Sequence, residues 1–185
     1  MEETKKTSFA EMLEKRDIRG LIELFRNNAL DTSDELLLLK SYEIPIISHY
    51  ATLYRLKEEN LKAIINKETP EYVIENIIKL NKYAFNDELQ QKLIDLRNPF
   101  LVKCYLSAFN KFSDKVLIDA VRKKDTRFLK EYINLRHFTH EVQKELVHSH
   151  NVEMIILYCD RHGFYKEVQK EFVTYLDTEA IGSIH

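Results

Sequence analysis

Glycine and proline are scarce in this chain. Its 185 residues include only three of each, whereas average usage gives roughly 13 glycines and 9 prolines at this length. Sandwiches, barrels and Rossmann-type sheets need many tight turns, which these residues supply, so the composition argues against all three. Apolar residues make up 44% and charged residues 31%, which excludes a disordered chain and a buried membrane bundle.

Targeting and membrane signals are also missing. The first residues contain lysines but no apolar signal core behind them. The longest apolar runs, such as Leu36–Leu39 and Met154–Tyr158, fall far short of the ~18 residues that a membrane span requires. The two cysteines, Cys104 and Cys159, form no CxxC pair. We therefore expect a cytoplasmic protein with two ordinary thiols and no membrane contact.

No catalytic signature occurs in the sequence. A P-loop, GxGxxG, GxSxG and HExxH are all absent, and three scattered glycines leave little to build a phosphate-binding loop. Carboxylate pairs are frequent, but at helix starts they complement the helix dipole. We expect a protein that is not an enzyme and holds no cofactor.

The strongest positive signal is an internal repeat. The segment EVQKE occurs at Glu141–Glu145 and again at Glu167–Glu171. Similar apolar blocks of five residues recur along the chain at nearly the same spacing. They are LIELF from Leu21, IISHY from Ile46, VIENI from Val73, LVKCY from Leu101, FLKEY from Phe128, MIILY from Met154 and AIGSI from Ala180. A nearly fixed period, here about 26 residues, is typical of stacked repeats.

Each repeat contains two helices. The first, second and fifth residues of a block are apolar and share one helix face, so each block belongs to a helix that we call helix B. Another helix, helix A, precedes it. The predicted N-caps of helix B are Asp17, Thr69, Asn98, Asp125, Asn151 and Asp177, and those of helix A are Ser33, Asn86, Ser113 and Thr139. Their side-chain oxygens can accept from the unpaired N–H groups of a first turn. Tyr83, Phe112, Phe138 and Phe164 are predicted to fill the junctions between repeats.

One such helix pair cannot bury its apolar face alone, but stacked neighbours can. The sequence therefore predicts an all-α fold. The predicted architecture is a right-handed α-solenoid of about six two-helix repeats, with a period of about 26 residues and a partial seventh repeat. We expect residues 1–185 to form a single helical-repeat domain without a linker.

The chain resembles the short-unit α-solenoids. The stretch ELQQKLIDLRNPFLVKCYLSAF, at Glu88–Phe109, is similar to a leucine-rich variant repeat: an apolar helix, an Asn-Pro turn and a second helix opening with aliphatic residues. HEAT-like repeats share the two-helix plan but are longer, at about 40–47 residues. The cysteine cluster with which some leucine-rich variant proteins hold an iron–sulfur centre is absent here.

Charge and histidine distribution leave two further possibilities open. Residues 97–140 carry ten basic and four acidic side chains, so they form either a phosphate-binding band or an ordinary solvated face.

Four histidines lie close together in the C-terminal third of the sequence: His137, His140, His148 and His150. Their spacings fit surface positions better than a metal site, and we expect no metal. A dispersed catalytic site involving His137, His140 or Asp160 is the least favoured alternative.

The exposed stripe of helix B is the predicted contact surface. It includes Ser48, Thr52 and Arg55 early in the chain. The predicted partner-binding residues are Glu75, Lys79, Lys82, Lys103, Ser107, Asn110, Arg127, Lys130, Asn134 and His137. We expect a non-catalytic scaffold that holds a protein or peptide there, and an acidic or phosphorylated peptide suits repeats three to five. Nucleic-acid binding through the basic band at 97–140 is the second hypothesis.

Overall fold

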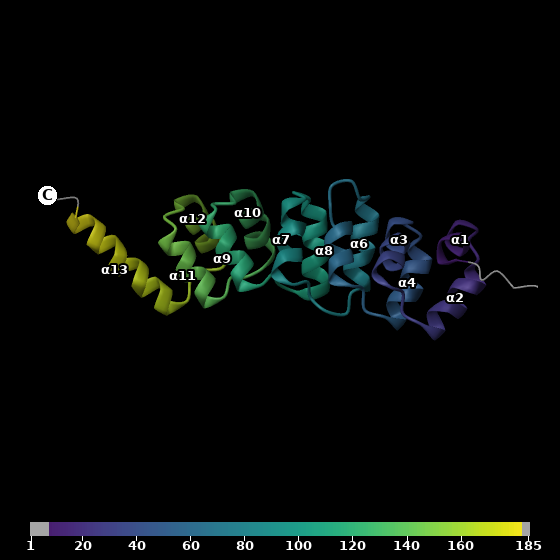
Figure 1. Cartoon of the computed structure of the whole chain (residues 1–185). Coiled ribbons are helices and arrows are strands. Elements are labelled where there is room, and N and C mark those ends of the chain that lie inside the picture. Colours follow the sequence, from purple (N-terminus) through teal and green to yellow (C-terminus); the bar gives the residue numbers. More distant parts are fainter. Residues whose placement is uncertain (1–7, 183–185) are drawn as a thin grey trace, which may run out of the picture. The chain divides into compact units, whose positions relative to one another are not determined.

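Helices make up the regular structure of the chain. The computed structural model describes residues 8–182, with side chains up to residue 174. Over residues 8–182 there are thirteen α-helices and no strand (Figure 1). The all-α class expected from the sequence is confirmed.

The chain divides into two compact units, which are described separately. Unit 1 ends at Asn110, and unit 2 begins at Lys111. The helices of unit 1 are α1 (Phe9–Glu14), α2 (Ile18–Asn27), α3 (Thr32–Lys40), α4 (Ile44–Leu53), α5 (Glu58–Ile64), α6 (Glu71–Leu80), α7 (Asp87–Asp95) and α8 (Pro99–Phe109). Those of unit 2 are α9 (Asp114–Arg122), α10 (Thr126–Leu135), α11 (His140–His148), α12 (Val152–Arg161) and α13 (Lys166–Gly182).

Within each unit, a helix packs on its next-but-one neighbour. In unit 1, α1, α3, α5 and α7 pack in succession, and so do α2, α4, α6 and α8. In unit 2, α9, α11 and α13 form one series, and α10 packs on α12. Each unit therefore has a layer of odd-numbered helices, which are the predicted helices A, and a layer of even-numbered helices, which are the predicted helices B.

A tight turn joins most odd-numbered helices to the next helix. Arg16, Tyr42, Arg97, Lys124 and His150 have φ between 51° and 58°, in the left-handed region that few non-glycine residues adopt. Each of them directly precedes the N-cap residue of an even-numbered helix. Chain reversal and helix start are thus set by two consecutive residues.

Most predicted N-caps are confirmed. Their side chains accept from backbone N–H groups of the first turn at 2.9 to 3.3 Å. The confirmed residues are Asp17, Asn86, Asn98, Ser113, Asp125 and Asn151. Thr139 is also an N-cap by position, but its hydroxyl donates to Asp114 Oδ2 at 2.9 Å instead.

Two predicted caps early in the chain are wrong. Ser33 lies inside α3, and Asp31 caps that helix by accepting from the Asp34 N–H at 2.8 Å. This start places two acidic residues in the first turn, where the helix dipole favours them. Thr69 precedes the true N-cap, Pro70, and its N–H donates to Asn66 Oδ1 at 3.0 Å within the loop.

The last predicted cap, Asp177, is wrong because α13 runs through it without a break. A turn there would place a non-glycine residue in the left-handed conformation, at a cost of about 1–2 kcal/mol. Among residues 8–182, no helix follows α13 whose packing could offset that cost.

The aromatic residues before the odd-numbered helices are buried, with one exception. Phe112 and Phe138 are buried, as is Phe164. Tyr83 was predicted to behave in the same way, but it is 61% exposed, and Phe85 takes the buried position. The prediction aligned the wrong ring of the loop with the other repeats.

Buried tyrosines of the even-numbered helices form hydrogen bonds with the backbone twenty residues earlier. The Tyr50 hydroxyl accepts from the Leu30 N–H at 3.2 Å, and the Tyr158 hydroxyl accepts from the Phe138 N–H at 3.1 Å. Both tyrosines are fully buried, and burial raises the pKa of both phenols. The fifth block position is therefore part of the core and also holds the start of the paired odd-numbered helix.

A buried side chain of the odd-numbered helix completes this arrangement. In unit 2, Gln143 Nε2 donates to the Phe138 carbonyl and to the Tyr158 hydroxyl, both at 3.0 Å. Its Oε1 accepts from the Tyr165 N–H at 2.9 Å. The amide thus ties α11 to α12 and to the start of α13.

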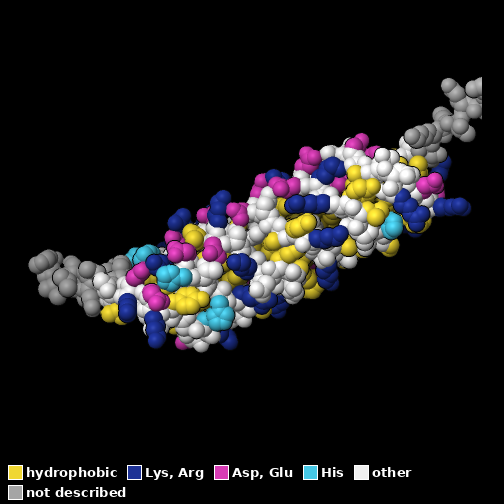
Figure 2. Space-filling view, turned by 90° about the horizontal axis from the view of Figure 1, so that it is seen from below, with side chains coloured by type: hydrophobic (Ala, Val, Ile, Leu, Met, Phe, Trp, Pro, Cys, Tyr) yellow, Lys and Arg dark blue, Asp and Glu magenta, His cyan; other side chains and the backbone are white. Residues whose placement is uncertain are grey.

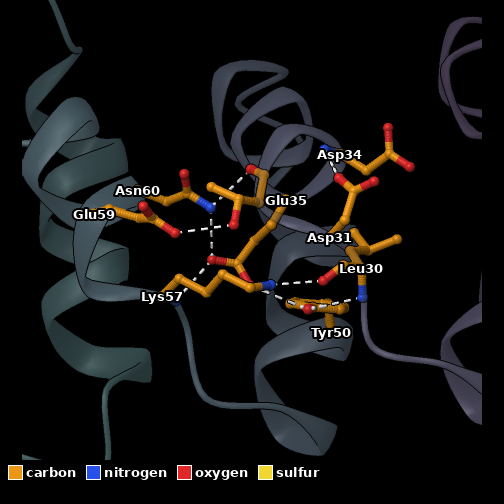
Figure 3. A network of polar contacts seen from close by, with 9 residues as sticks. Leu30, Asp31, Asp34, Glu35, Tyr50, Lys57, Glu59 and Asn60 are labelled. Atoms are coloured by element: carbon orange, nitrogen blue, oxygen red, sulfur yellow. Dashed lines mark hydrogen bonds and ion pairs between the residues drawn. The ribbon is translucent and has the colours of Figure 1, made fainter.

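Glu35 occupies the corresponding place in unit 1 (Figure 3). Its carboxylate is fully buried and faces only donors. One oxygen accepts from the Lys57 N–H at 2.7 Å and from Asn60 Nδ2 at 3.0 Å. The other accepts from the Tyr50 hydroxyl at 3.1 Å and from Lys57 Nζ at 3.3 Å. The buried charge is fully satisfied, as burial of a charge requires.

Candidate partner-binding surface

The two helix layers of unit 1 differ in charge. The odd-numbered helices contain nine acidic and three basic residues. The even-numbered helices contain three acidic and four basic residues, and Arg55 and Lys82 follow α4 and α6. Figure 2 shows Lys, Arg and hydrophobic side chains side by side over the N-terminal part of one face, at the right of the view. We call the exposed surface of α2, α4, α6 and their C-terminal turns the even-helix face.

Exposed apolar side chains mark the same layer. Ile18 on α2 and Leu53 on α4 are each 47% exposed, and Tyr72 on α6 is 50% exposed. Phe100 on α8 is also exposed. Among the described residues, the only other exposed large apolar side chain in a helix of unit 1 is Leu37 on α3.

An apolar cavity lies between α2 and α4. Its volume is about 220 Å³, and Ile18, Ile22, Pro45 and Ile46 are among the side chains that line it. His49 also lines the cavity, and its Nε2 is buried and has no hydrogen-bond partner among the described residues. The wall of the cavity is therefore largely apolar, and one of its lining residues, His49, holds a buried polar atom without a partner among the described residues.

A second cavity, of about 160 Å³, lies where α4 and α6 end. Leu53, Arg55, Lys82 and Tyr83 are among its lining residues. The Arg55 guanidinium carbon stands 5.0 Å from the centre of the Tyr83 ring, a cation–π distance. We call it the Arg55 cavity. Tyr54 and the exposed Tyr83 form its aromatic wall, and the sequence prediction missed the exposure of Tyr83.

Four cations of the even-helix face lack a carboxylate partner among the described residues. They are Arg19, Arg26, Arg55 and Lys82. By contrast, Lys62 of the odd layer pairs with Glu58 at 3.2 Å and with Glu88 at 2.6 Å. These four cations are thus not neutralised by an ion pair with any described residue.

The predicted contact residues of unit 1 lie on this layer and are fully or partly exposed. Lys79 pairs with Glu75 one turn away, which raises the pKa of the lysine. Lys82 lines the Arg55 cavity. The others, Lys103, Ser107 and Asn110, are exposed on α8 and at its C-cap. Apart from Lys82, none of them lines either cavity.

The predicted contact residues of unit 2 are exposed and mostly engaged with neighbours. Lys130 Nζ lies 2.6 Å from the Glu153 carboxylate of α12. Arg127 Nε lies 4.0 Å from Glu131 Oε1 on the same helix. The His137 ring is 4.1 Å from the His162 ring. Asn134, on the same exposed side of α10, completes the set.

The basic band of residues 97–140 is partly neutralised in the same way. Arg122 donates two hydrogen bonds to the Glu145 carboxylate, at 2.9 and 3.1 Å. The guanidinium lowers the pKa of Glu145. Carboxylates of α11 and α12 thus pair with two cations of the band, Arg122 and Lys130, which the sequence left open as part of either a phosphate-binding band or a solvated face.

The predicted contact residues and the lining of the two cavities overlap only in part. Sequence reasoning identified Arg55 as an exposed stripe residue but did not find Ile18, Arg19 or His49. An apolar residue directly after an N-cap, as at Ile18, was the available signal, because that position of a helix is normally exposed. The cavities themselves depend on pairs of helices and have no linear signature.

Neither a metal cluster nor a membrane helix is found in the described residues. There, no three His, Cys, Asp or Glu side chains gather in a way that could hold a metal ion. Among the helices of residues 8–182, none has both the length and the apolar character needed to cross a bilayer. No protein-family model matches the chain, and neither the curated proteins nor the solved structures yield a match.

Proposed function

We propose that the chain is a non-catalytic interaction module that binds an acidic peptide segment of a partner protein on its even-numbered helices. The observation that carries this proposal is the pairing of two cavities with unpaired cations on the even-helix face of unit 1. Apolar cavities supply contact area, and unpaired cations supply complementarity to a negative partner. This function makes the protein a scaffold rather than an enzyme.

The proposal includes the architecture that would present this face. We infer a right-handed α-solenoid of about six two-helix repeats with a period of about 26 residues, in which α13 is a partial seventh repeat. The recurring left-handed turn and the next-but-one helix packing support it. Because each repeat of such an array contacts only its neighbours, deletion of residues 115–140 should leave a shorter protein with unchanged helicity per residue and cooperative unfolding. Loss of folding on this deletion would contradict the solenoid.

Nucleic-acid binding through residues 97–140 is the weaker candidate. Ion pairs such as Arg122–Glu145 and Lys130–Glu153 reduce the number of cations in the band that are free for phosphate. Sequence-independent binding to a duplex depends on such free cations.

A peptide-display selection against the purified protein tests the function. We expect enrichment of peptides with acidic and apolar residues, and loss of their binding in an Arg55→Glu/Lys82→Glu variant. A Lys40→Glu/Lys92→Glu variant makes the same change in charge on the odd-numbered helices and should bind normally. Equal loss in both variants would show that binding follows net charge. Failure to enrich any peptide family would count against the proposal.

A further inference from the structure

We propose that the apolar cavity between α2 and α4 takes one bulky apolar side chain of the bound peptide, and that acidic residues about four positions away reach the Arg55 cavity. This inference rests on the proposed function and specifies its ligand. It assigns the two cavities different roles, one for the anchor and one for the acidic group.

The size and lining of the first cavity fit a leucine or phenylalanine side chain. Its volume is about 220 Å³, and an apolar cavity of about 150 Å³ is known to admit benzene. The ring of Phe25 forms part of the wall and lies 6.4 Å from the His49 ring, centre to centre. Ile18 and Pro45, at the rim, are exposed, so a side chain can enter without displacing the core.

His49 supplies the polar contact of the anchor position. Its Nε2 is buried and unbonded among the described residues, and a buried polar atom left unpaired costs free energy. A rotation of the His49 ring that brings Nε2 to the cavity would let this atom pair with a backbone N–H or C=O of an extended peptide whose apolar side chain fills the cavity. The contact favours a peptide backbone over a small apolar molecule.

The charge around the cavities selects an acidic partner. Arg19 and Arg26 lie on α2, which borders the anchor cavity, and neither has a carboxylate partner among the described residues. At the second cavity, Arg55 is held against Tyr83. Among the described residues, Lys82 Nζ has one hydrogen bond, to the carbonyl of Thr52 at 3.5 Å. An arginine fixed in this way can receive a carboxylate with little loss of side-chain freedom.

Helix geometry sets the spacing between the two positions. His49 lies four residues before Leu53, the last residue of α4, which is about 6 Å along the helix axis. Tyr54, which is extended, and Arg55 lie beyond that end, and we take the axial distance from His49 to Arg55 as about 9 Å. The cavities lie on opposite sides of α4, so they are also offset by about one interhelical spacing of 8–10 Å. The diagonal is about 13 Å, which an extended peptide covers in about four residues.

A synthetic peptide series measures this arrangement. The probes are acetylated 12-residue Gly/Ser peptides with one leucine and an Asp-Asp pair, placed two to six positions apart in either direction. We expect the tightest binding at a spacing of four, and at least a tenfold loss when the leucine is replaced by alanine. Binding that is independent of both spacing and the leucine would overturn the inference.

Matched variants locate the anchor. Ile18→Glu places a charge at the cavity rim, at the first position of α2, where the helix dipole tolerates acid. It should weaken binding of the best peptide at least tenfold. Val152→Glu is the control, because Val152 also follows an N-cap and is exposed, at the start of α12. It should leave binding unchanged, and equal effects of the two changes would refute the assignment.

His49→Leu keeps the cavity apolar and removes Nε2. It should weaken binding of the leucine peptide without lowering the stability of the protein to urea, because the change removes a buried polar atom that has no partner among the described residues. If the peptides selected by display bind but ignore Ile18→Glu and His49→Leu, the anchor assignment fails and the proposed function stands. If neither the selected nor the synthetic peptides bind, both fail.

Discussion

The Glu35 network allows a strict test of the packing between helices. In unit 1 the buried side chain is Glu35, and Lys57 is the N-cap of the next odd-numbered helix. In unit 2 the equivalent residues are Gln143 and Tyr165. Their backbone contacts agree, because the Lys57 N–H donates to Glu35 and the Tyr165 N–H donates to Gln143. The pairs Glu–Lys and Gln–Tyr are therefore alternative solutions to one packing problem.

Glu35→Gln alone should destabilise the protein by about 2 kcal/mol, because a hydrogen bond to a charged group contributes about 1.5–3 kcal/mol. The Tyr50 hydroxyl, the Lys57 N–H and ammonium, and the Asn60 amide all donate to the carboxylate, so the amide NH₂ of glutamine must face at least one other donor. The lysine side chain is 33% exposed, which keeps the loss below the roughly 3–5 kcal/mol of a fully buried broken pair.

Lys57→Tyr alone should lower the free energy of unfolding by about as much as Glu35→Gln does. It leaves the buried carboxylate of Glu35 without the ammonium group of Lys57. The double variant should restore the arrangement of unit 2 and lose about 1–2 kcal/mol less than the sum of the single losses, within the range known for coupled neighbours.

Urea unfolding followed by circular dichroism at 222 nm measures the cycle, provided that the slope with urea stays constant. Glu59→Gln, on the exposed side of the same helix start, is the control and should change stability by less than about 0.5 kcal/mol. Additivity of the two network changes within about 0.5 kcal/mol would refute the proposed equivalence.

Three further predictions concern single sites. Gly20→Ala should not give the usual gain of about 1 kcal/mol, because its Cβ would stand 2.4 Å from the Asp17 carboxylate that caps α2; in an Asp17→Ala background, urea unfolding should show the gain. Burial raises the pKa of Tyr105 to about 12, so absorbance at 295 nm should show it ionising well above the ordinary value near 10, with folding stability falling as pH rises through that range. Arg122 holds the pKa of Glu145 below its ordinary value of 4.5; the wild type should therefore be more stable than Arg122→Gln at pH 7, and unfolding curves should converge as pH falls through the lowered pKa. A gain from Gly20→Ala in the wild type, ionisation near pH 10, or a pH-independent difference would contradict the respective argument.

Local sequence determined the helices and most of their starts. N-caps such as Asp17 and Asn98 act through hydrogen bonds that span two or three residues, so their effect can be read from neighbouring positions. Helix periodicity alone places the apolar columns of the five-residue blocks on one face. In the six blocks whose side chains the structure describes, these columns are buried, except that Ile22 is half-buried. Errors arose where two capping residues competed, as at Asp31 and Ser33.

The candidate contact surface depended on tertiary structure. Tyr83 and Phe85 stand two positions apart in one loop, and only packing against the neighbouring helices decides which ring is buried. The same holds for charge: the sequence counts Arg122 and Lys130 as a basic band, but carboxylates from other helices pair with both, whereas Arg55 has no carboxylate partner among the described residues. Helix formation is set by neighbours along the chain, while cavities and free charges are set by residues more than twenty positions apart, whose distances only the packed helices determine.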